Sequence, residues 1–386
     1  MRILHVITGL KKAAGTSTFC GEVCNQLASL GHDVTIAVCN PSDPDIYPLD
    51  SRIHLVSIAS ILHSTPTPTP YTYSLVHIHG LWSWPLHQVS SWACAQKIPV
   101  VWSTHGMTAP WALKHKWWKK CLPWFLYQKR DLKKARLIHC TSDFEIEWNQ
   151  RLGFKRTFLA PLGTFLPEEY RPHADSSTSK TLLFVGRIYP VKALDRLIEA
   201  FSKVRQVEVE RCKEWVLRIV GPDQAGHMAE LMSLCDRLGL SYSTPEGKVI
   251  IHAKPAPDFK ITIRPAVEFA GPKFGKELDD EYANCDALAL VSHTENFGAT
   301  VVDAMAYGKP VVTSTKTPWK IVVDRECGWW VDNDVESLSE ALSQLSSQSD
   351  SQILAMGERG RKLVEDKYTW PAIGKQMIIE YNKLVK

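Results

Sequence analysis

The chain has 386 residues, of which 45% are hydrophobic and 22% charged, a composition typical of globular proteins rather than of disordered, collagen-like or coiled-coil chains. At about 150 residues per domain, this length predicts two or three domains. No run of 18 apolar residues occurs, and the N-terminal segment MRILHVITGLKK is typical of a first β-strand rather than of a signal peptide. The ten cysteines form no CxxC pair, so we expect free thiols in a reducing cytoplasm.

The net charge of +4 is unevenly distributed along the chain. Residues 1–165 contain 17 Lys/Arg and 9 Asp/Glu, and nine of the fourteen tryptophans lie before residue 150. A basic and aromatic first half indicates an anionic partner or a membrane surface.

Predicted strands and helices alternate along the whole chain, which indicates an α/β fold with parallel sheets covered by helices. In the first half we expect a helix over 16–30, with Thr16 as N-cap and Gly31 as its stop. Segment 61–74, rich in Pro and Thr, is expected to be a loop. The strands expected in this half are 3–7, 33–38, 75–79, 100–103 and 137–141.

A second strand series follows a polar, breaker-rich stretch that is typical of a linker. Segment 243–266 interrupts the alternation and is expected to be an insertion, such as a small hairpin. The expected strands of this series are 181–185, 216–220, 267–270, 287–291 and 309–313, and the last helix is expected over 370–385. We therefore expect two doubly wound Rossmann-like domains, 1–165 and 181–367, with a linker at 166–180 and a C-terminal helix within 368–386 that crosses back to the first domain.

The most informative motif is VSHTENFGATVVDAMAYGKPVV at 291–312. It leaves a strand, places Glu295 in a loop, and enters a helix near Gly298. A glycine there allows close backbone approach, and the free N–H groups and the dipole of a helix N-terminus favour a phosphate. Asp303 follows Glu295 by eight residues. Taken alone, the motif is equally well explained by a helix with two solvated carboxylates.

This motif resembles the E-x7-E motif of glycosyltransferase family 4, a family of retaining enzymes with the GT-B fold, in which two Rossmann-like domains face a central cleft. The resemblance implies that Glu295 contacts the donor sugar. It also implies that Asp303, which stands where the family has Glu, holds the nucleotide ribose. The motif's Asn296, Phe297 and Gly298 are then expected to bind the donor, although Asn296 replaces the usual Gly.

A second segment, FVGRIYPVKALDRLIEAF at 184–201, resembles the family's GR…KG segment. Arg187 and Lys192 then face the donor diphosphate, and Ala193 stands at the family's Gly. Charge-assisted contacts of this kind contribute about 1.5–3 kcal/mol each. Gly221 resembles a glycine turn of the donor site, although a plain turn explains it equally well. Gly15 matches one glycine of the family's loop after the first strand.

In the first half, His105 follows an expected strand within WSTHGM. The resemblance points to His105 as the histidine that faces the donor sugar and the acceptor, whereas a lone histidine is more often structural. His79 ends another expected strand and is a candidate for lining the acceptor cleft. Thr141 and Glu145 match a T.S..E element of the family, which could simply cap the following helix.

Residues 111–136 contain nine Lys/Arg, one Asp and four tryptophans. Such a segment suits an anionic membrane interface or a phosphorylated lipid acceptor. No nucleic-acid-binding module accompanies it, so we expect no nucleic-acid partner. The alternative is a solvated helix face whose tryptophans pack in the core. The candidate acceptor or membrane face consists of His79, Trp111, Lys114, Trp117, Trp118, Lys119 and Lys120.

The resemblance implies retaining transfer of a hexose from a UDP- or GDP-sugar to a saccharide or lipid-linked saccharide acceptor. It places the protein in cell-surface polysaccharide or lipopolysaccharide synthesis, peripheral on the inner face of the cytoplasmic membrane. Arg187, Lys192 and the helix start at Gly298 would stabilise the departing diphosphate, so we expect neither a metal ion nor a cofactor. Two alternatives stay open, a sugar-nucleotide epimerase of the same fold and a non-catalytic saccharide-binding relative. The absence of a GxGxxG fingerprint disfavours a nicotinamide oxidoreductase.

Overall fold

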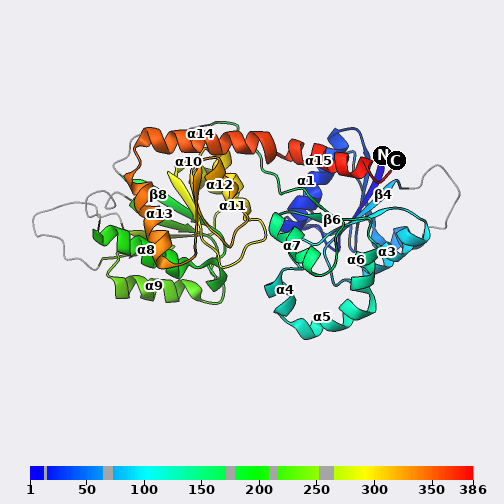
Figure 1. Ribbon diagram of the computed structural model, residues 1–386, viewed down its shortest axis with the longest axis horizontal. Coiled ribbons are helices and arrows are strands. Elements are labelled where there is room, and N and C mark those ends of the chain that lie inside the picture. The colour runs from blue at the N-terminus through cyan, green and yellow to red at the C-terminus, as the bar shows by residue number, and fades with distance from the viewer. Residues whose placement is uncertain (13–14, 64–72, 171–178, 208–214, 252–264, 386) are drawn as a thin grey trace, which may run out of the picture. The chain divides into compact units, whose positions relative to one another are not determined.

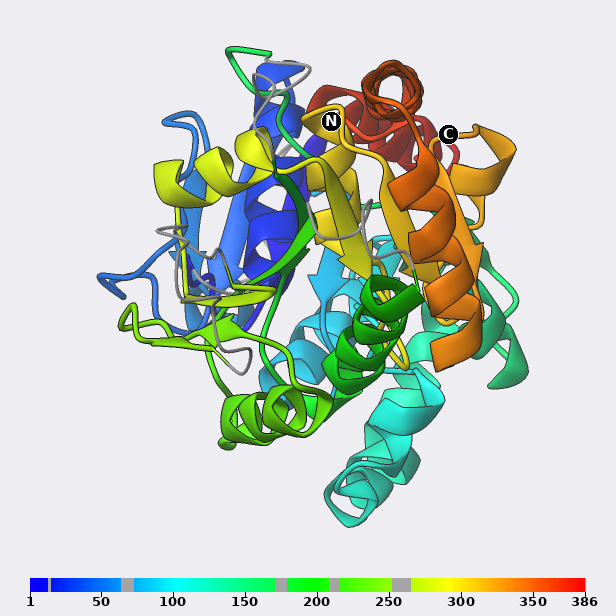
Figure 2. The same ribbon diagram turned by 90° about the vertical axis from the view of Figure 1, so that its left-hand side faces the viewer.

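The protein is described here by a computed structural model that covers residues 1–12, 15–63, 73–170, 179–207, 215–251 and 265–385. It divides into two compact units. Unit 1 consists of Met1–Gly163 and Tyr368–Lys386, and unit 2 consists of Thr164–Lys367. Each unit is built on its own sheet with helices on both faces, as Figures 1 and 2 show.

Unit 1 contains a seven-stranded parallel sheet in the order β3-β2-β1-β4-β5-β6-β7. Parallel strands need crossovers, and right-handed helical crossovers place helices on both faces. The strands are β1 (Arg2–Val6), β2 (Asp33–Val38), β3 (His54–Ser57), β4 (Leu75–His79), β5 (Val100–Ser103), β6 (Leu137–Cys140) and β7 (Thr157–Leu159). The central strand β4 is buried along its whole length.

The sheet of unit 1 separates the core into two layers, one on each face. On one face, Phe19, Val23 and Leu27 of α1 pack with Ile373 and other residues of α15. On the other, a cluster that includes Trp102 packs beneath α2 and α3. The helices are α1 (Gly15–Ser29), α2 (Ile58–His63), α3 (Trp84–Ala95), α4 (Pro110–Lys114), α5 (Trp117–Pro123), α6 (Lys129–Lys134), α7 (Asp143–Arg151) and α15 (Trp370–Asn382), with a π-helix at Trp124–Gln128.

The C-terminal helix α15 is part of unit 1. Thr369 caps its N-terminus, since the side chain accepts a hydrogen bond from the N–H of Ala372. A Cβ on Gly374 would meet Cβ of Gln26 at 2.6 Å, so the glycine lets α15 approach α1 closely. This close packing buries Tyr381 completely.

Unit 2 contains an eight-stranded sheet in the order β11-β10-β12-β9-β8-β13-β14-β15. Only the pair β10–β11 is antiparallel among the described strand pairs of this unit. The strands are β8 (Lys180–Val185), β9 (Trp215–Val220), β10 (Tyr242–Ser243), β11 (Val249–Ile250), β12 (Val267–Gly271), β13 (Ala287–Leu290), β14 (Val311–Ser314) and β15 (Gly328–Val331).

Helices cover both faces of this second sheet (Figure 1), with α8 and α9 on one side and α10 and α14 on the other. The helices are α8 (Leu194–Val207), α9 (His227–Leu238), α10 (Lys276–Asn284), α11 (Ala299–Ala306), α12 (Ile321–Asp324), α13 (Val335–Ser347) and α14 (Asp350–Lys367), with a 3₁₀ turn at Pro190–Lys192. No described helix is both long and apolar enough to span a membrane.

The predicted fold class is confirmed, since both units are doubly wound α/β sheets. The strands over 33–38, 75–79 and 100–103 have the predicted bounds, and the insertion expected at 243–266 begins with the antiparallel pair β10–β11. Its residues 252–264 lie outside the described residues, as do 64–72 of the predicted loop. The sequence analysis missed β3, β7 and β15.

Candidate functional site

The carboxyl ends of β8 and β9 meet at two glycine turns in unit 2. Gly186 and Gly221 have φ angles of 156° and 149°, which favour glycine. A Cβ on Gly221 would lie 1.8 Å from the carbonyl oxygen of Gly186, so no side chain fits there. Gly221 also donates its N–H to the carbonyl of Gly271 at 2.9 Å. The predicted Gly221 turn is thus a point of very close backbone approach beside the strand ends.

Lys192 and Glu295, which are 103 residues apart in sequence, form a close ion pair. Lys192 Nζ lies 2.6 Å from Glu295 Oε2, and the two side chains are only 15% and 19% exposed. The turn of Lys192 and the loop of Glu295 are joined by the backbone, since the N–H of His293 donates to the carbonyl of Val191. The structure therefore brings together a cation and a carboxylate that the sequence analysis had assigned to the diphosphate and to the sugar.

Ser292 is a further residue of this site that the sequence analysis did not identify. Its hydroxyl donates to Glu295 Oε2 at 3.2 Å, so one carboxylate oxygen accepts from both Ser292 and Lys192. The carbonyl of Ser292 in turn accepts from the hydroxyl of Ser314. Two donors on one oxygen restrict the orientation of the Glu295 carboxylate.

Arg187 is exposed and lies on the turn after β8. Its guanidinium donates to Gln224 Oε1 at 2.9 Å, which holds the side chain beside the turn that follows β9. An exposed guanidinium with one neutral partner remains available to an anion.

Helix α11 begins beside Glu295, with Gly298 as its N-cap at φ 81°. A Cβ on Gly298 would meet Leu290 Cδ2 at 2.7 Å, so the turn requires glycine for its conformation and for space. The preceding Phe297 is buried, and its carbonyl accepts a hydrogen bond from Nε1 of the buried Trp319 at 2.5 Å. No side chain of the N-cap covers the first N–H groups of α11, so this helix start can accept an anion.

Asp303, one turn further along α11, hydrogen-bonds inside unit 2. Thr164 donates its hydroxyl to Asp303 Oδ1 at 2.6 Å. Burial raises the pKa of Asp303 to about 6, and the nearby charge of Asp279 acts in the same direction while the Thr164 hydrogen bond opposes it. Thr164 was not identified from sequence. Its hydroxyl hydrogen-bonds to the same carboxylate that the resemblance assigns to the ribose.

A hollow of about 910 Å³ lies beside Asp303 and contains many carboxylates. The buried Tyr282 hydroxyl within it has no hydrogen-bond partner among the described residues. Residues of the segment after Gly163, of α10 and of α11 line this hollow: Thr164, Phe165, Leu166, Pro167, Glu168, Glu169, Lys276, Leu278, Asp279, Asp280, Tyr282, Ala283, Asn284, Asp303 and Tyr307. Asp303 is therefore accessible from a cavity large enough for a nucleoside.

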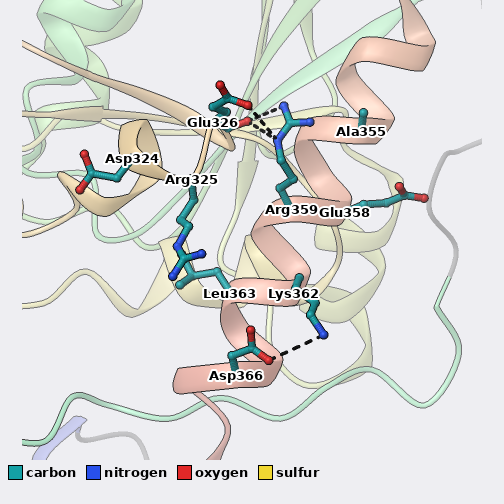
Figure 3. Close-up of a pocket in the computed structure, with 9 residues that line it drawn as sticks. All are labelled: Asp324, Arg325, Glu326, Ala355, Glu358, Arg359, Lys362, Leu363 and Asp366. Carbon is teal, nitrogen blue, oxygen red and sulfur yellow. Dashed lines mark hydrogen bonds and ion pairs between the residues drawn. The ribbon is translucent and has the colours of Figure 1, made fainter.

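A second hollow of about 500 Å³ in unit 2 lies between α12 and α14. Figure 3 shows that the Arg359 side chain in it points toward Glu326, whose carbonyl accepts from Nε and Nη2 of Arg359 at 2.9 and 2.7 Å. Lys362 pairs with Asp366 one turn along the same helix. The hollow therefore lies on the α12 and α14 side of unit 2 and contains none of the predicted site residues.

In unit 1, His105 lies in the loop after β5 with a left-handed φ of 48°. Its Nε2 lies 3.1 Å from Nδ1 of His79. Burial among other histidines lowers the pKa of His105 to about 3, so the ring is neutral at pH 7. The backbone conformation at a non-glycine residue costs about 1–2 kcal/mol, which the surrounding contacts must offset.

The buried carboxylate of Glu145 holds this loop and was assigned only a capping role from sequence. Its Oε1 accepts from the hydroxyl of Thr104 and from the N–H of Gly106, both at 2.5 Å. Its Oε2 accepts from the N–H of Thr141 at 2.8 Å. Glu145 thus ties the residues on either side of His105 to the start of α7.

Four more histidines lie buried in the core of unit 1 near His105, and only His79 of these was identified from sequence. His77 contacts the Tyr381 hydroxyl at 2.5 Å and Ser103 Oγ at 2.6 Å, and Ser103 also contacts His139. His5 contacts His79 Nε2 through its Nδ1 at 2.9 Å. Hydrogen bonds group the five rings into two sets: His5, His79 and His105 in one, and His77 and His139, joined through Ser103, in the other.

Ligand atoms of His5, Cys20 and His79 lie within 4.8 Å of one another, as a metal site requires. The facing nitrogens of His5 and His79 are 2.9 Å apart, a hydrogen-bond distance. Two nitrogens on one tetrahedral zinc ion would lie about 3.3 Å apart. The observed contact therefore fits a shared proton between the rings.

The predicted acceptor or membrane face is partly formed in unit 1. Helix α5 has no buried residue and projects from the unit (Figures 1 and 2). Trp111, Trp117 and Trp118 are 55%, 64% and 63% exposed, contrary to the alternative in which they pack in the core. Lys114 and Lys119 are exposed as well, and Lys119 Nζ lies 5.0 Å from the centre of the Trp118 ring.

Two residues of that face have other roles. Lys120 donates to the carbonyls of Ala112 and His115, so it ties α5 to α4. His79 is 2% exposed, and both of its ring nitrogens contact other histidines. The prediction that His79 lines an open face is therefore wrong, because the end of β4 lies inside the core. Gly15 begins α1 and is exposed.

The two halves of the chain match two glycosyltransferase family models. Residues 13–163 match Glycosyltransferase Family 4, and residues 179–348 match Glycosyl transferases group 1. Among curated proteins, the chain is 25% identical over 253 residues to the alpha-1,3/1,6-mannosyltransferase alg2 of Schizosaccharomyces pombe. That match covers 63% of this chain and 45% of the relative, so the chain spans less than half of that relative's length.

Solved structures match over nearly the whole chain. Anabaena Alr3699/HepE in complex with UDP has a TM-score of 0.70 at 15% identity, over 99% of this chain and all of that one. WaaG, a glycosyltransferase involved in lipopolysaccharide biosynthesis, has a TM-score of 0.64 at 15% identity, over 97% of this chain and 99% of that one. The chain therefore has the GT-B fold of glycosyltransferases, and each of its halves resembles a glycosyltransferase family.

Proposed function

We propose that the protein is a retaining glycosyltransferase that transfers a hexose from a nucleotide diphosphate sugar to a saccharide or lipid-linked saccharide acceptor. The observation that carries this proposal is the 2.6 Å contact between Lys192 and Glu295 beside the uncapped start of α11. A cation, helix N–H groups and a fixed carboxylate within one site suit a diphosphate joined to a sugar. The UDP complex of Alr3699/HepE, which shares the fold, is consistent with this donor class.

In this proposal the protein supplies orientation and charge. Arg187, Lys192 and the start of α11 hold the diphosphate and stabilise the negative charge that develops as it leaves. Glu295 and His105 contact the sugar, and Asp303 holds the ribose. The departing diphosphate helps to take the acceptor's proton, so the transfer needs neither a cofactor nor a metal ion.

Biosynthesis of a cell-surface polysaccharide or lipopolysaccharide is the process we propose, because WaaG is described as a lipopolysaccharide enzyme. The acceptor would then be attached to a membrane lipid. This assignment agrees with an exposed basic and aromatic surface in unit 1, made by α4, α5 and the π-helix.

The donor reaction can be followed by proton NMR on the purified protein with a panel of UDP-, GDP- and ADP-sugars. A retaining transferase without acceptor releases its sugar slowly to water, first as the anomer present in the donor. An epimerase would instead convert one nucleotide sugar into another, and a non-catalytic relative would change none of them. Release of the opposite anomer would contradict retention.

We also propose that unit 1 binds an anionic membrane surface through this face, and that the protein is peripheral on the cytoplasmic membrane. Leu122, Phe125 and Leu126 are 66%, 75% and 60% exposed and extend the tryptophan surface onto the π-helix. Aromatic and apolar side chains among lysines suit the headgroup region of anionic lipids. Each lysine near such a surface contributes about 1 kcal/mol.

Flotation with anionic and neutral vesicles tests this surface. We expect binding to anionic vesicles that weakens with added salt, because charges are screened over about 8 Å at physiological ionic strength. Trp117→Ala/Trp118→Ala should reduce the bound fraction, whereas Phe274→Ala, at a similarly exposed aromatic of unit 2, should not. Equal flotation with neutral and anionic vesicles would contradict the proposal.

A further inference from the structure

His5, His79 and His105 form a linear chain of rings in unit 1. His105 Nε2 contacts His79 Nδ1 at 3.1 Å, and His79 Nε2 contacts His5 Nδ1 at 2.9 Å. Neighbouring rings are stacked, with centroids 5.4 and 5.2 Å apart and interplanar angles of 23° and 19°. The chain runs from β1 through β4 to the loop after β5.

The three rings cannot choose their tautomers independently. Burial lowers the pKa of His5 and His105 to about 3 and that of His79 well below its usual value, so all three are neutral at pH 7. A neutral imidazole has one N–H and one acceptor nitrogen. Each of the two nitrogen–nitrogen contacts needs a single proton between its atoms. The three rings are therefore either all protonated on Nδ1 or all protonated on Nε2.

The inner end of the chain distinguishes these two states. Nε2 of His5 is buried and has no hydrogen-bond partner among the described residues. In the Nε2–H state this atom is a buried N–H group without an acceptor, which is rare in proteins. In the Nδ1–H state this atom is an acceptor without a donor among the described residues, and a buried acceptor without a partner is less rare in proteins than a buried N–H group without one. The environment of His5 therefore favours the Nδ1–H state for the whole chain.

The outer end of the chain is where a substrate could be contacted. His105 is partly exposed, and its Nδ1 makes no hydrogen bond with the described residues. With Nε2 accepting from His79, Nδ1 carries the proton and can donate to a sugar oxygen. In the opposite tautomer, Nδ1 of His105 would carry a lone pair. It could then accept a hydrogen bond from a sugar hydroxyl but could not donate one to a sugar oxygen.

We propose that His79 is a positioning residue that fixes His105 as the Nδ1–H tautomer, so that His105 donates a hydrogen bond to an oxygen of the bound sugar. This inference rests on the proposed function for the identity of that oxygen. The tautomer itself is a property of the free protein. His5 is the inner end of the three-ring chain. His139 is not part of this chain, because its ring nitrogens contact the carbonyl of Ala160 and the hydroxyl of Ser103.

The tautomer can be read directly by ¹⁵N NMR of protein labelled at histidine, in which protonated and bare ring nitrogens have well-separated shifts. His105→Gln identifies the His105 signals by their disappearance. We expect His105 to carry its proton on Nδ1 in the wild-type protein. A proton on Nε2 of His105 would overturn the inference without the need for any variant of His79.

Variants of His79 then test the positioning role. His79→Phe should give His105 a mixture of tautomers and lower kcat about tenfold with an unchanged KM for the donor. His79→Asn keeps an amide N–H near the position of Nδ1. It should therefore restore part of the preference of His105 for one tautomer and part of the lost kcat. His139→Asn is the matched control, because it removes a buried histidine that does not contact His105 and should leave the His105 tautomer unchanged.

The failures of the two proposals are distinguishable. Loss of tautomer order in His79→Phe with unchanged turnover per folded molecule would overturn the positioning role and leave the proposed transferase activity intact. Absence of any donor turnover in the wild-type protein would overturn the proposed function, whereas the ¹⁵N spectrum would still report the tautomer. An unchanged His105 spectrum in His79→Phe would overturn the inference in either case.

Discussion

Lys192 Nζ and Glu295 Oε2 lie 2.6 Å apart in a partly buried ion pair that joins the turn after β8 to the loop after β13. In the free protein, Glu295 therefore neutralises the cation that we assign to the diphosphate. A bound diphosphate would compete for Lys192, and the displaced carboxylate would face the sugar beside it. The pair links donor binding to the orientation of Glu295.

Glu295→Gln should separate catalysis from nucleotide binding. The substitution removes the negative partner of Lys192, so we expect affinity for the nucleoside diphosphate to be at least as high as in the wild type. Turnover should fall about 10²–10³-fold, the usual effect of losing one well-placed polar contact in a transition state. The measurement pairs calorimetric affinity with initial rates on one preparation. Weaker diphosphate binding together with normal turnover would contradict the assignment of Glu295 to the sugar.

Asp303 should make binding of a nucleotide sugar depend on pH. Its pKa of about 6 lies above the usual carboxyl value, so the group loses its charge as the pH falls below 6. If the carboxylate accepts the ribose hydroxyls, affinity should decline about tenfold between pH 7 and pH 5. The esterified diphosphate of a nucleotide sugar does not titrate in this range.

Asp303→Asn is the matched control for this effect and should bind with little pH dependence. Asp303→Glu, which restores the family's residue, should be tolerated or bind the donor more tightly. An identical pH profile in the wild type and in Asp303→Asn would show that another group titrates.

The buried histidines should make unit 1 sensitive to acid. Burial lowers the pKa of His5 to about 3 and that of His139 to about 4, below the value of about 6.5 in the unfolded chain. Their stabilising contribution is therefore complete above pH 6.5 and is lost as the pH falls toward their folded pKa values. At pH 5, each of these two histidines lowers the free energy of unfolding by about 2 kcal/mol relative to its value above pH 6.5.

The melting temperature should accordingly fall steeply between pH 7 and pH 5. His139→Asn should reduce the slope, because it removes one group that takes up a proton on unfolding. A melting temperature that is constant over this range would mean that the histidines remain solvated or already charged.

Turnover should persist in excess EDTA, since fixed cations and helix N–H groups stabilise the leaving diphosphate in the proposed mechanism. The rates with EDTA and with added Mg²⁺ are expected to agree. Complete loss of activity that Mg²⁺ restores would contradict this part of the mechanism.

Central strands of the fold were predictable from sequence, whereas edge strands were not. β2, β4 and β5 are mostly apolar runs that are buried along nearly their whole length, as expected of strands buried on both faces. The missed strands β3, β7 and β15 all lie at sheet edges. Edge strands are half exposed and short, so their sequences HLVS, TFL and GWWV lack a long apolar run.

The candidate site was predictable where a local motif carries the chemistry. Lys192 and Glu295 each stand in such a motif, and the fold brings the two motifs together. The interactions of Thr164 and Glu145 could not be predicted, because their partners lie 139 and 41 residues away in sequence. For the histidine core a signal was present: His77 and His79 alternate on β4 and so share one face of the strand.

The central claim, that unit 2 binds a nucleoside diphosphate through Arg187 and Lys192, is tested most directly by calorimetric titration of UDP, GDP and ADP into four proteins. These are the wild type, Lys192→Ala, Arg187→Ala, and Lys203→Ala as the control. Lys203 is an exposed lysine paired with Glu336 and outside the proposed site. We expect one diphosphate to bind the wild type and the control equally, and each of the other variants to lose about 2 kcal/mol, or about 30-fold in affinity. Unchanged affinity in both Lys192→Ala and Arg187→Ala would contradict the claim.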